Sequence, residues 1–129
     1  LINWLTATES NFNDIPLLLI DDEVVCGFGR TGRMFGIEHF GVTPDIMTLA
    51  KGLGSSYVPI GAVIATTQIT DAFAGKENIF YAALTAGGHP VSTASALANI
   101  NIIEQEGLVE ASAVKGRYFI NRLNFLCFE

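Results

Sequence analysis

Two residues of opposite charge follow short predicted strands, and a carboxylate and an amine placed this way could form a catalytic pair. Asp22 comes just after the apolar run 17–20, and Lys51 comes just after the segment 45–50. Ligands of open α/β sheets bind at the carboxyl ends of strands. A lysine placed there can act as a nucleophile toward a carbonyl group and as a proton carrier. Charges also stand at strand ends simply because solvent begins there, and these two residues alone leave both interpretations open.

The segment 27–32 fits the pattern G-x-G-x-x-G, which also occurs in dinucleotide-binding folds. That fingerprint needs a strand directly before the loop, a long helix behind it and an acidic residue at the end of the next strand. Here six residues separate the apolar run from Gly27, Gly41 ends the following helix early, and the next strand ends at Lys51. The pattern therefore favours a tight turn that requires glycines.

Three short segments are predicted to form the strands that position these residues. The run 17–20 is apolar throughout, which is typical of a strand buried on both faces of a parallel sheet. The segments 45–50 and 60–66 are the other two predicted strands. Strands that alternate with helices indicate an α/β fold.

Two short helices are expected beside these strands. The first lies within 34–40 and is closed by Gly41. The second covers 69–73, with Thr67 or Thr70 as its cap.

Two longer helices are predicted in the second half of the chain, after a loop at 75–88. Pro90 stands where the helix 91–106 can begin, because its missing N–H is not needed in the first turn. Gly107 ends this helix, and a last helix covers 109–126. Small and apolar residues recur at helical spacing in the first of the two: Val91, Ala94, Ala98 and Ile102.

Composition and charge exclude several classes of protein. The 129 residues suit one domain or part of one, and 50% hydrophobic with 16% charged residues excludes general disorder. A net charge of −6 with only seven Lys and Arg gives no basic stripe, so we expect no nucleic-acid partner. The longest apolar runs are too short to span a bilayer, so we expect no membrane partner.

The cysteines and histidines predict neither a disulfide framework nor a metal site. Cys26 and Cys127 are far apart, and His39 and His89 are isolated. Reduced thiols, with no secretory signal visible, favour a cytoplasmic protein. The chain starts at a residue other than Met and stops within a helical pattern, so we expect part of a larger protein. A processed or unusual complete protein is the alternative.

Several separate motifs occur in a defined order along most of the chain, from about Leu17 to Leu123. They are Asp22-Glu23-Val24, Cys26-Gly27-Phe28-Gly29-Arg30-Thr31-Gly32, Pro44-Asp45, Lys51-Gly52-Leu53 and Pro59-Ile60-Gly61-Ala62. This order and spacing resembles the class III aminotransferases, the branch of fold-type I pyridoxal-phosphate (PLP) enzymes that includes the omega-transaminases. With Val25 before it, the glycine segment looks more like the omega-amine:pyruvate group than the GABA or ornithine groups.

The resemblance implies a role for each of four residues. Lys51 would form a Schiff base with the aldehyde of pyridoxal 5'-phosphate and then act as general base and acid. Asp22 would face the pyridine nitrogen and keep it protonated, and Val24 would pack on one face of the ring. Thr85, in a Thr-x-x-Gly-x-Pro stretch, would bind the cofactor phosphate of the neighbouring subunit, which implies a homodimer with shared active sites.

Two neighbouring residues carry expectations of their own. A carboxylate at Asp21 would raise the pKa of Asp22 if both faced inward, but strand alternation predicts that Asp21 points the other way. Arg30 could pair with a substrate carboxylate, and a structural role bracing the glycine loop is the favoured interpretation.

The resemblance also implies a fold and an activity. We expect residues 1–129 to be part of a PLP-binding large domain with a mostly parallel sheet flanked by helices, its motifs within about 17–107 and a helical segment at 109–126. The activity would be transamination between an amine or amino acid donor and a keto acid acceptor such as pyruvate. The alternatives are a catalytically incomplete fragment, or another class III activity such as an aminomutase or a dialkylglycine decarboxylase.

Overall fold

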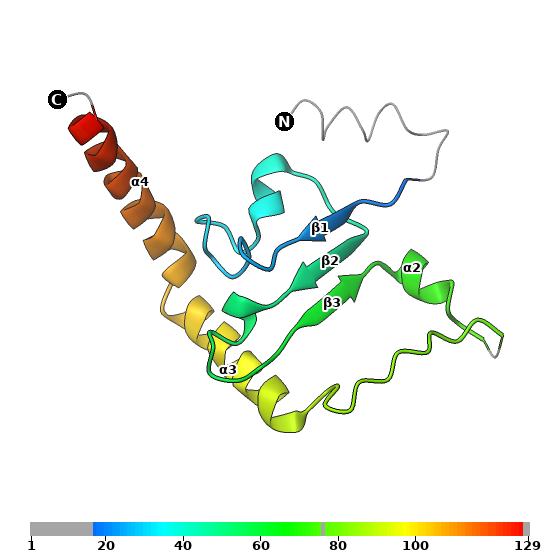
Figure 1. The fold of residues 1–129 in the computed structure, drawn as a ribbon. Helices are drawn as coiled ribbons and strands as arrows, with labels where there is room; N and C mark the ends of the chain where they lie inside the picture. Colours follow the sequence, from blue (N-terminus) through cyan, green and yellow to red (C-terminus); the bar gives the residue numbers. More distant parts are fainter. Residues whose placement is uncertain (1–16, 76, 128–129) are drawn as a thin grey trace.

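The computed structural model describes residues 17–75 and 77–127 (Figure 1). Strands alternate with helices along the chain, and the expected α/β class is confirmed. The elements, with η for 3₁₀ helices, are β1 (Ile20–Asp22), η1 (Gly36–Phe40), β2 (Ile46–Leu49), η2 (Lys51–Leu53), β3 (Ala62–Ala65), α2 (Thr67–Asp71), α3 (Pro90–Gln105) and α4 (Leu108–Cys127).

The three strands form one mixed sheet in the order β1-β2-β3. β1 pairs with β2 in parallel, with Asp22 opposite Thr48. β2 pairs with β3 in antiparallel fashion, with Leu49 opposite Ala62. The carboxyl ends of β1 and β2 therefore lie at the same edge of the sheet as the amino end of β3.

The first strand differs from its prediction in position and in burial. It begins at Ile20, because the Leu19 N–H donates to Asp45 Oδ2 at 2.8 Å instead of to a backbone carbonyl. The expectation of a strand buried on both faces is wrong for the described chain, since Leu17, Leu18 and Ile20 are 55–61% exposed. β1 is an edge strand here, and the core lies beneath its neighbour instead.

The main buried cluster lies beneath the carboxyl end of β2. Leu49, Leu53 and Ala96 are its centre, contributed by β2, η2 and α3. Partly buried hydrophobic residues pack around them: Phe28, Phe35, Met47, Ile60, Ala62 and Ile100. Burial of apolar surface stabilises a fold by about 25 cal/mol per Å². Because Leu53 belongs both to this cluster and to η2, the core packs directly behind the turn that carries Lys51.

The two long helices lie within one residue of their predicted boundaries. Pro90 opens α3, and Gly107, at φ 61°, separates it from α4. Val91 and Ile102, two of the small and apolar residues that recur at helical spacing, are 62% and 48% exposed. The buried residues of α3 are Ala96, Asn99 and Ile103. An apolar pattern does not mark this face because its central residue is polar.

The short helices are close to their predicted places. Gly41 closes η1 in the left-handed conformation, as expected. α2 begins at Thr67, with Thr66 and not Thr67 or Thr70 as its N-cap residue, so the predicted cap is wrong. The described residues of 75–88 contain neither helix nor strand, as predicted, and Figure 1 shows them returning from α2 to α3 in an extended course.

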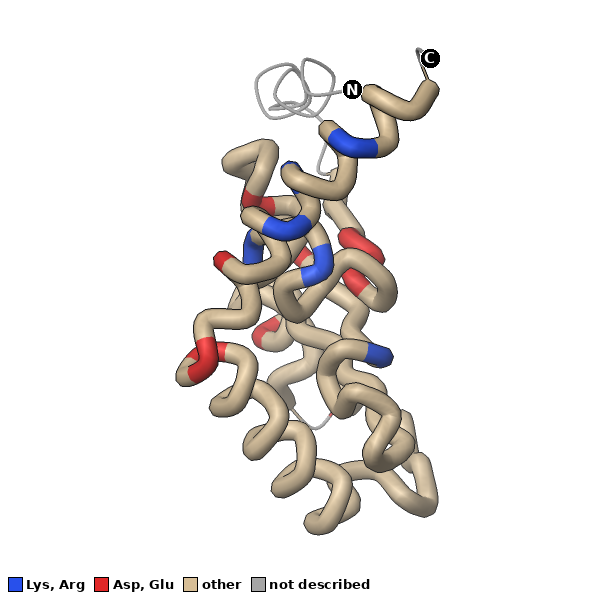
Figure 2. The backbone as a smooth tube through the Cα atoms, turned by 90° about the vertical axis from the view of Figure 1, so that its left-hand side faces the viewer, with Lys and Arg blue, Asp and Glu red and all other residues tan. Residues whose placement is uncertain are grey.

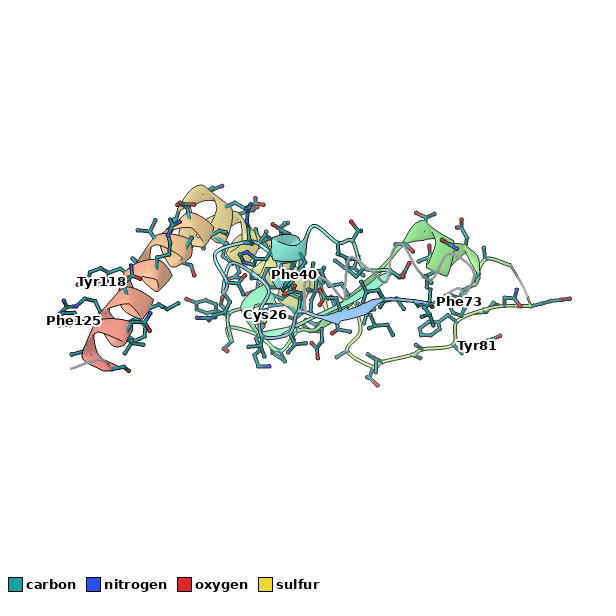
Figure 3. All side chains as sticks on the ribbon, turned by 90° about the horizontal axis from the view of Figure 1, so that it is seen from above. Cys26, Phe40, Phe73, Tyr81, Tyr118 and Phe125 are labelled. Carbon is teal, nitrogen blue, oxygen red and sulfur yellow. The ribbon has the colours of Figure 1, made fainter. Side chains whose placement is uncertain are left out.

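α3 crosses one end of the sheet, and α4 runs away from it (Figure 1). Seen from above, Tyr118 and Phe125 lie on the part of α4 that extends past the sheet (Figure 3). Both side chains are more than half exposed. Charged residues are sparse on the backbone, with long uncharged stretches between them (Figure 2).

No helix among the described residues is both long enough and apolar enough to cross a membrane. The same part of the chain holds no group of three or more His, Cys, Asp or Glu residues that could hold a metal ion.

Candidate active site

Asp22 is the last residue of β1, and its carboxylate is held by two donors. Thr48, its partner in the register with β2, donates from Oγ1 to Asp22 Oδ1 at 3.1 Å. The Val24 N–H donates to the same oxygen at 3.0 Å. These two hydrogen bonds hold the Asp22 carboxylate in one orientation at the end of β1.

Lys51 is the first residue of the turn η2, which begins two residues after β2 ends. Its backbone lies in the left-handed region at φ 39°, where a side chain normally meets steric strain. Its carbonyl accepts hydrogen bonds from the N–H groups of Gly54 at 3.1 Å and Ser55 at 2.8 Å, which close the turn. Strained backbone of this kind is concentrated at functional sites.

A pocket of about 300 Å³ lies beside Lys51. The Lys51 side chain is exposed and forms part of the pocket wall. A volume of this size is at the lower end of the range for small-molecule sites. The other lining residues form one continuous segment: Ser56, Tyr57, Val58, Pro59 and Ile60.

The sheet topology brings Asp22 and Lys51 to the same edge. Asp22 lies directly opposite Thr48, and Lys51 follows Thr48 by three residues. Three residues of extended chain span at most about 11 Å. The two predicted site residues are therefore neighbours at the carboxyl ends of adjacent parallel strands, the location where ligands of α/β sheets bind.

Two further acidic residues, Asp21 and Glu23, lie on either side of Asp22 in the sequence. Glu23 is 2% exposed, and its Oε1 accepts the Ile37 N–H at 2.7 Å. Burial, together with the charge of Glu23, a hydrogen bond with it and the charge of Asp22, raises the pKa of Asp21 to about 6. Asp21 therefore contacts Glu23, two residues on, which agrees with the expected strand alternation.

The neighbouring Glu23 carboxyl group favours the protonated form of Asp21. Asp21 Oδ2 and Glu23 Oε2 are buried, and neither has a donor among the residues the structure describes. A proton on Asp21 supplies that donor, because a protonated carboxyl can donate to a carboxylate. Below about pH 6 the neutral form of Asp21 is therefore favoured in this packing.

The glycine loop packs closely against the beginning of α4. A Cβ on Gly32 would lie 2.8 Å from the Ala113 Cβ, so only glycine fits. Ser112 Oγ donates to the Arg30 carbonyl at 3.4 Å, while the Arg30 side chain is exposed. The next element is the five-residue η1 and not a long helix, which agrees with a tight turn and not a dinucleotide loop.

The other two predicted site residues lie at different distances from this edge. Val24 lies two residues after the end of β1 and is half-buried. Thr85 is exposed in the turn 85–88, where the Gly87 N–H donates to the Leu84 carbonyl at 2.9 Å. That turn belongs to the extended segment that Figure 1 shows between α2 and α3. The structure thus groups Asp22, Val24 and Lys51 and places Thr85 in a separate segment.

Three residues at the site were not expected from the sequence. Thr48 holds Asp22, Glu23 binds the start of η1, and Asn99 donates to carbonyl groups in the Lys51 turn. Glu23 had a signal, because it stands within a run of three acidic residues. The sequence signal for Asn99 was weak: it is a polar residue three positions after Ala96 and four before Ile103.

Comparison with known proteins places this geometry in a family. The model of the class-III aminotransferase family matches residues 3–127. The chain is 42% identical to the putrescine aminotransferase of Pectobacterium atrosepticum, over 98% of this chain and 27% of that protein. It is 46% identical to the putrescine–pyruvate aminotransferase of Pseudomonas aeruginosa, over 73% of this chain and 20% of that protein.

A solved structure shows the same fold. The (S)-enantioselective omega-transaminase from Thermomicrobium roseum superposes with a TM-score of 0.88 at 41% identity, covering 95% of this chain and 28% of that one. The chain belongs to the class III aminotransferase family, and the expected fold-type I architecture is confirmed. It spans about a quarter of the length of these relatives.

Proposed function

We propose that the protein containing this chain catalyses PLP-dependent transamination between an amine or amino acid and a keto acid such as pyruvate. The observation that carries the proposal is the placement of Lys51 and Asp22 at the ends of adjacent parallel strands, with a pocket beside the lysine. The relatives named for putrescine and pyruvate support a diamine donor and a pyruvate acceptor.

The residues present fit pyridoxal 5'-phosphate. An exposed amine borders a pocket of about 300 Å³, and an anchored carboxylate stands on the neighbouring strand. When bound, PLP supplies an aldehyde that condenses with amines and a pyridinium ring that accepts electrons. Lys51 and Asp22 would hold it, with Val24 packed against the ring.

Each residue then has a defined task. Lys51 Nζ is the only ionisable group in the pocket lining besides Tyr57 among the described residues. It would take the proton from the substrate carbon and return it two atoms away, in a 1,3-proton shift. Asp22 holds a negative charge toward the ring nitrogen. Thr48 and Val24 both donate to Asp22 Oδ1, and we assign Asp22 Oδ2 to face that nitrogen.

The site is tested by trapping the cofactor covalently on the lysine that binds it. PLP is added to the purified protein, the product is reduced with borohydride, and the modified peptide is mapped by mass spectrometry. We expect the adduct on Lys51 and its loss in Lys51→Ala, with Lys115→Ala as a matched control that keeps it. An adduct that persists in Lys51→Ala contradicts the assignment.

The reaction is tested separately by its products. An amine panel that includes putrescine is incubated with pyruvate, and we expect alanine with loss of the donor amine. Carbon dioxide release would indicate a decarboxylase, and amine migration within one molecule would indicate an aminomutase. Either result would replace transamination by one of those class III activities.

We further propose a cytoplasmic homodimer in which Thr85 serves the partner's site. Two exposed free cysteines support a reducing compartment, and the separate position of Thr85 supports a shared site. Equal amounts of Lys51→Ala and Thr85→Val subunits are mixed after separate purification. Shared sites predict that about a quarter of the sites are restored, because each mixed dimer has one intact site. No recovery in mixed dimers contradicts sharing.

A further inference from the structure

The turn that carries Lys51 holds more than one residue in unfavourable backbone conformation. Lys51, Ser55 and Ser56 have φ values of 39°, 46° and 65°, and none of them is glycine. Such conformations persist only where surrounding contacts determine them. The position of Lys51 therefore depends on groups outside the turn.

Asn99 of α3 is the polar group that reaches this turn from behind. Its side chain is 9% exposed, and Nδ2 donates to the Gly52 carbonyl at 2.8 Å and to the Leu53 carbonyl at 3.1 Å. An amide NH₂ group has two hydrogens, and this geometry uses both on successive carbonyls. The Gly52–Leu53 and Leu53–Gly54 peptide groups are thus both held by a single side chain.

The opposite side of the same turn rests on the glycine loop. A Cβ on Gly52 would lie 2.9 Å from the Phe28 Cβ and 3.3 Å from the Gly27 carbonyl oxygen. The turn therefore has no space to move toward that loop. Leu53, beside Gly52, is buried against Leu49 and Ala96.

We propose that Asn99 is a positioning residue that sets the direction of the Lys51 side chain by holding the Gly52 and Leu53 carbonyls against the glycine loop. The inference rests on the proposed role of Lys51 and goes beyond it by naming a residue on another element. Asn99 is not among the residues that line the pocket beside Lys51, and it acts through the backbone of the turn.

The first experiment requires no cofactor. Amide exchange is measured in the unsubstituted protein and in Asn99→Asp, which keeps the shape and removes both donors. We expect the Asn99 side-chain amide protons to be protected and those of exposed Asn101 to exchange freely. In Asn99→Asp, the N–H groups of Leu53, Gly54 and Ser55 should exchange about tenfold faster or more. An unprotected Asn99 amide, or unchanged exchange in the turn, overturns the proposal.

The second experiment asks whether the turn positions Lys51. Asn99→Leu and Asn99→Asp are compared with the matched variants Asn101→Leu and Asn101→Asp, at temperatures where circular dichroism shows folded protein. We expect the borohydride-trappable link between Lys51 and PLP to form about tenfold more slowly in the Asn99 variants. The pH midpoint of its visible absorbance should also move away from that of the parent, and the Asn101 variants should match the parent.

The outcomes separate this inference from the proposed function. If the unsubstituted protein forms no adduct on Lys51, the proposed function fails, while the exchange experiment still decides whether Asn99 holds the turn. If exchange accelerates but the rate and the pH midpoint of the link are those of the parent, Asn99 only stabilises the fold, and the positioning role is wrong.

Discussion

Asp22 and Thr48 lie opposite each other on parallel strands, and the Thr48 hydroxyl donates to Asp22 Oδ1 at 3.1 Å. The bond crosses from β1 to β2, so the strand that precedes Lys51 also orients the carboxylate proposed to face the pyridine nitrogen. The relative position of the two proposed site residues is thus set by one pair of strands.

Removing the Thr48 hydroxyl should weaken cofactor binding. Thr48→Val keeps the shape and removes one of the two donors to Asp22 Oδ1. A hydrogen bond to a charged group contributes about 1.5 kcal/mol at the lower end of its range, which suits this exposed pair, so we expect PLP to bind about tenfold more weakly. The measurement is an absorbance titration, with exposed Thr43→Val as the control. Equal affinities of the two variants would contradict a role for Thr48.

The chemistry of Lys51 and the strain at its backbone can be separated. Lys51→Gly and Lys51→Ala both remove the amine, so both should lose the borohydride adduct. Glycine adopts φ 39° without a Cβ penalty, and we expect Lys51→Gly to be about 1 kcal/mol more stable than Lys51→Ala. Urea unfolding of the two variants measures the difference. Equal stability would show that the turn is not strained at this position.

Asp21 should make the protein less stable as the pH rises through 6. Its pKa is raised to about 6 in the folded state, against about 4 when unfolded, so the folded state binds the extra proton between these values. The free energy of unfolding should therefore fall from about pH 4 to above pH 6.

Asp21→Asn should remove this pH dependence. Asparagine is neutral at every pH and can donate to Glu23, so the variant should be about 1 kcal/mol more stable than the parent at pH 7, after allowance for solvent screening. Thermal unfolding between pH 4 and pH 8 checks both the slope and the sign. Parallel curves for parent and variant would place the titrating group elsewhere.

The approach of the glycine loop to α4 can be tested with two glycines. Gly32 and Gly41 both have positive φ, at 84° and 66°, but only Gly32 has a neighbour within 4 Å of an added Cβ. Gly41→Ala should cost about 1–2 kcal/mol of backbone strain. Gly32→Ala should cost about 1–3 kcal/mol more, because its Cβ would overlap Ala113. Chemical denaturation of both variants compares them, and similar losses would argue against close packing at Gly32.

Local pattern was sufficient to predict the two charged strand ends and most element boundaries. Prolines and glycines affect the backbone only a few residues away. Pro90, Gly41 and Gly107 therefore predicted helix ends that the structure confirms. The placement of Asp22 and Lys51 at the same edge of the sheet followed from the rule that parallel strands end at one edge. Their chemical roles came from the motif resemblance and stay proposals.

Features that depend on distant partners were not predictable in the same way. Asn99 bonds carbonyls 46 and 47 residues away, so nothing beside it in the sequence marks it as buried. The edge position of β1 depends on strand order, and its exposed apolar residues contradicted an expectation based on composition alone. The antiparallel pairing of β3 likewise depends on the course of the chain after Lys51.

The contacts on both sides of Gly52 have a consequence for the order of folding. Phe28 precedes the Lys51 turn by more than twenty residues and Asn99 follows it by more than forty, so the turn can take its final shape only after both have docked. Contacts so distant in sequence form late, because loop closure precedes any gain from them. Asn99→Asp should accordingly speed unfolding in stopped-flow experiments and leave the refolding rate nearly unchanged. The site whose motifs are the most recognisable in the sequence is therefore expected to be among the last parts of the chain to fold.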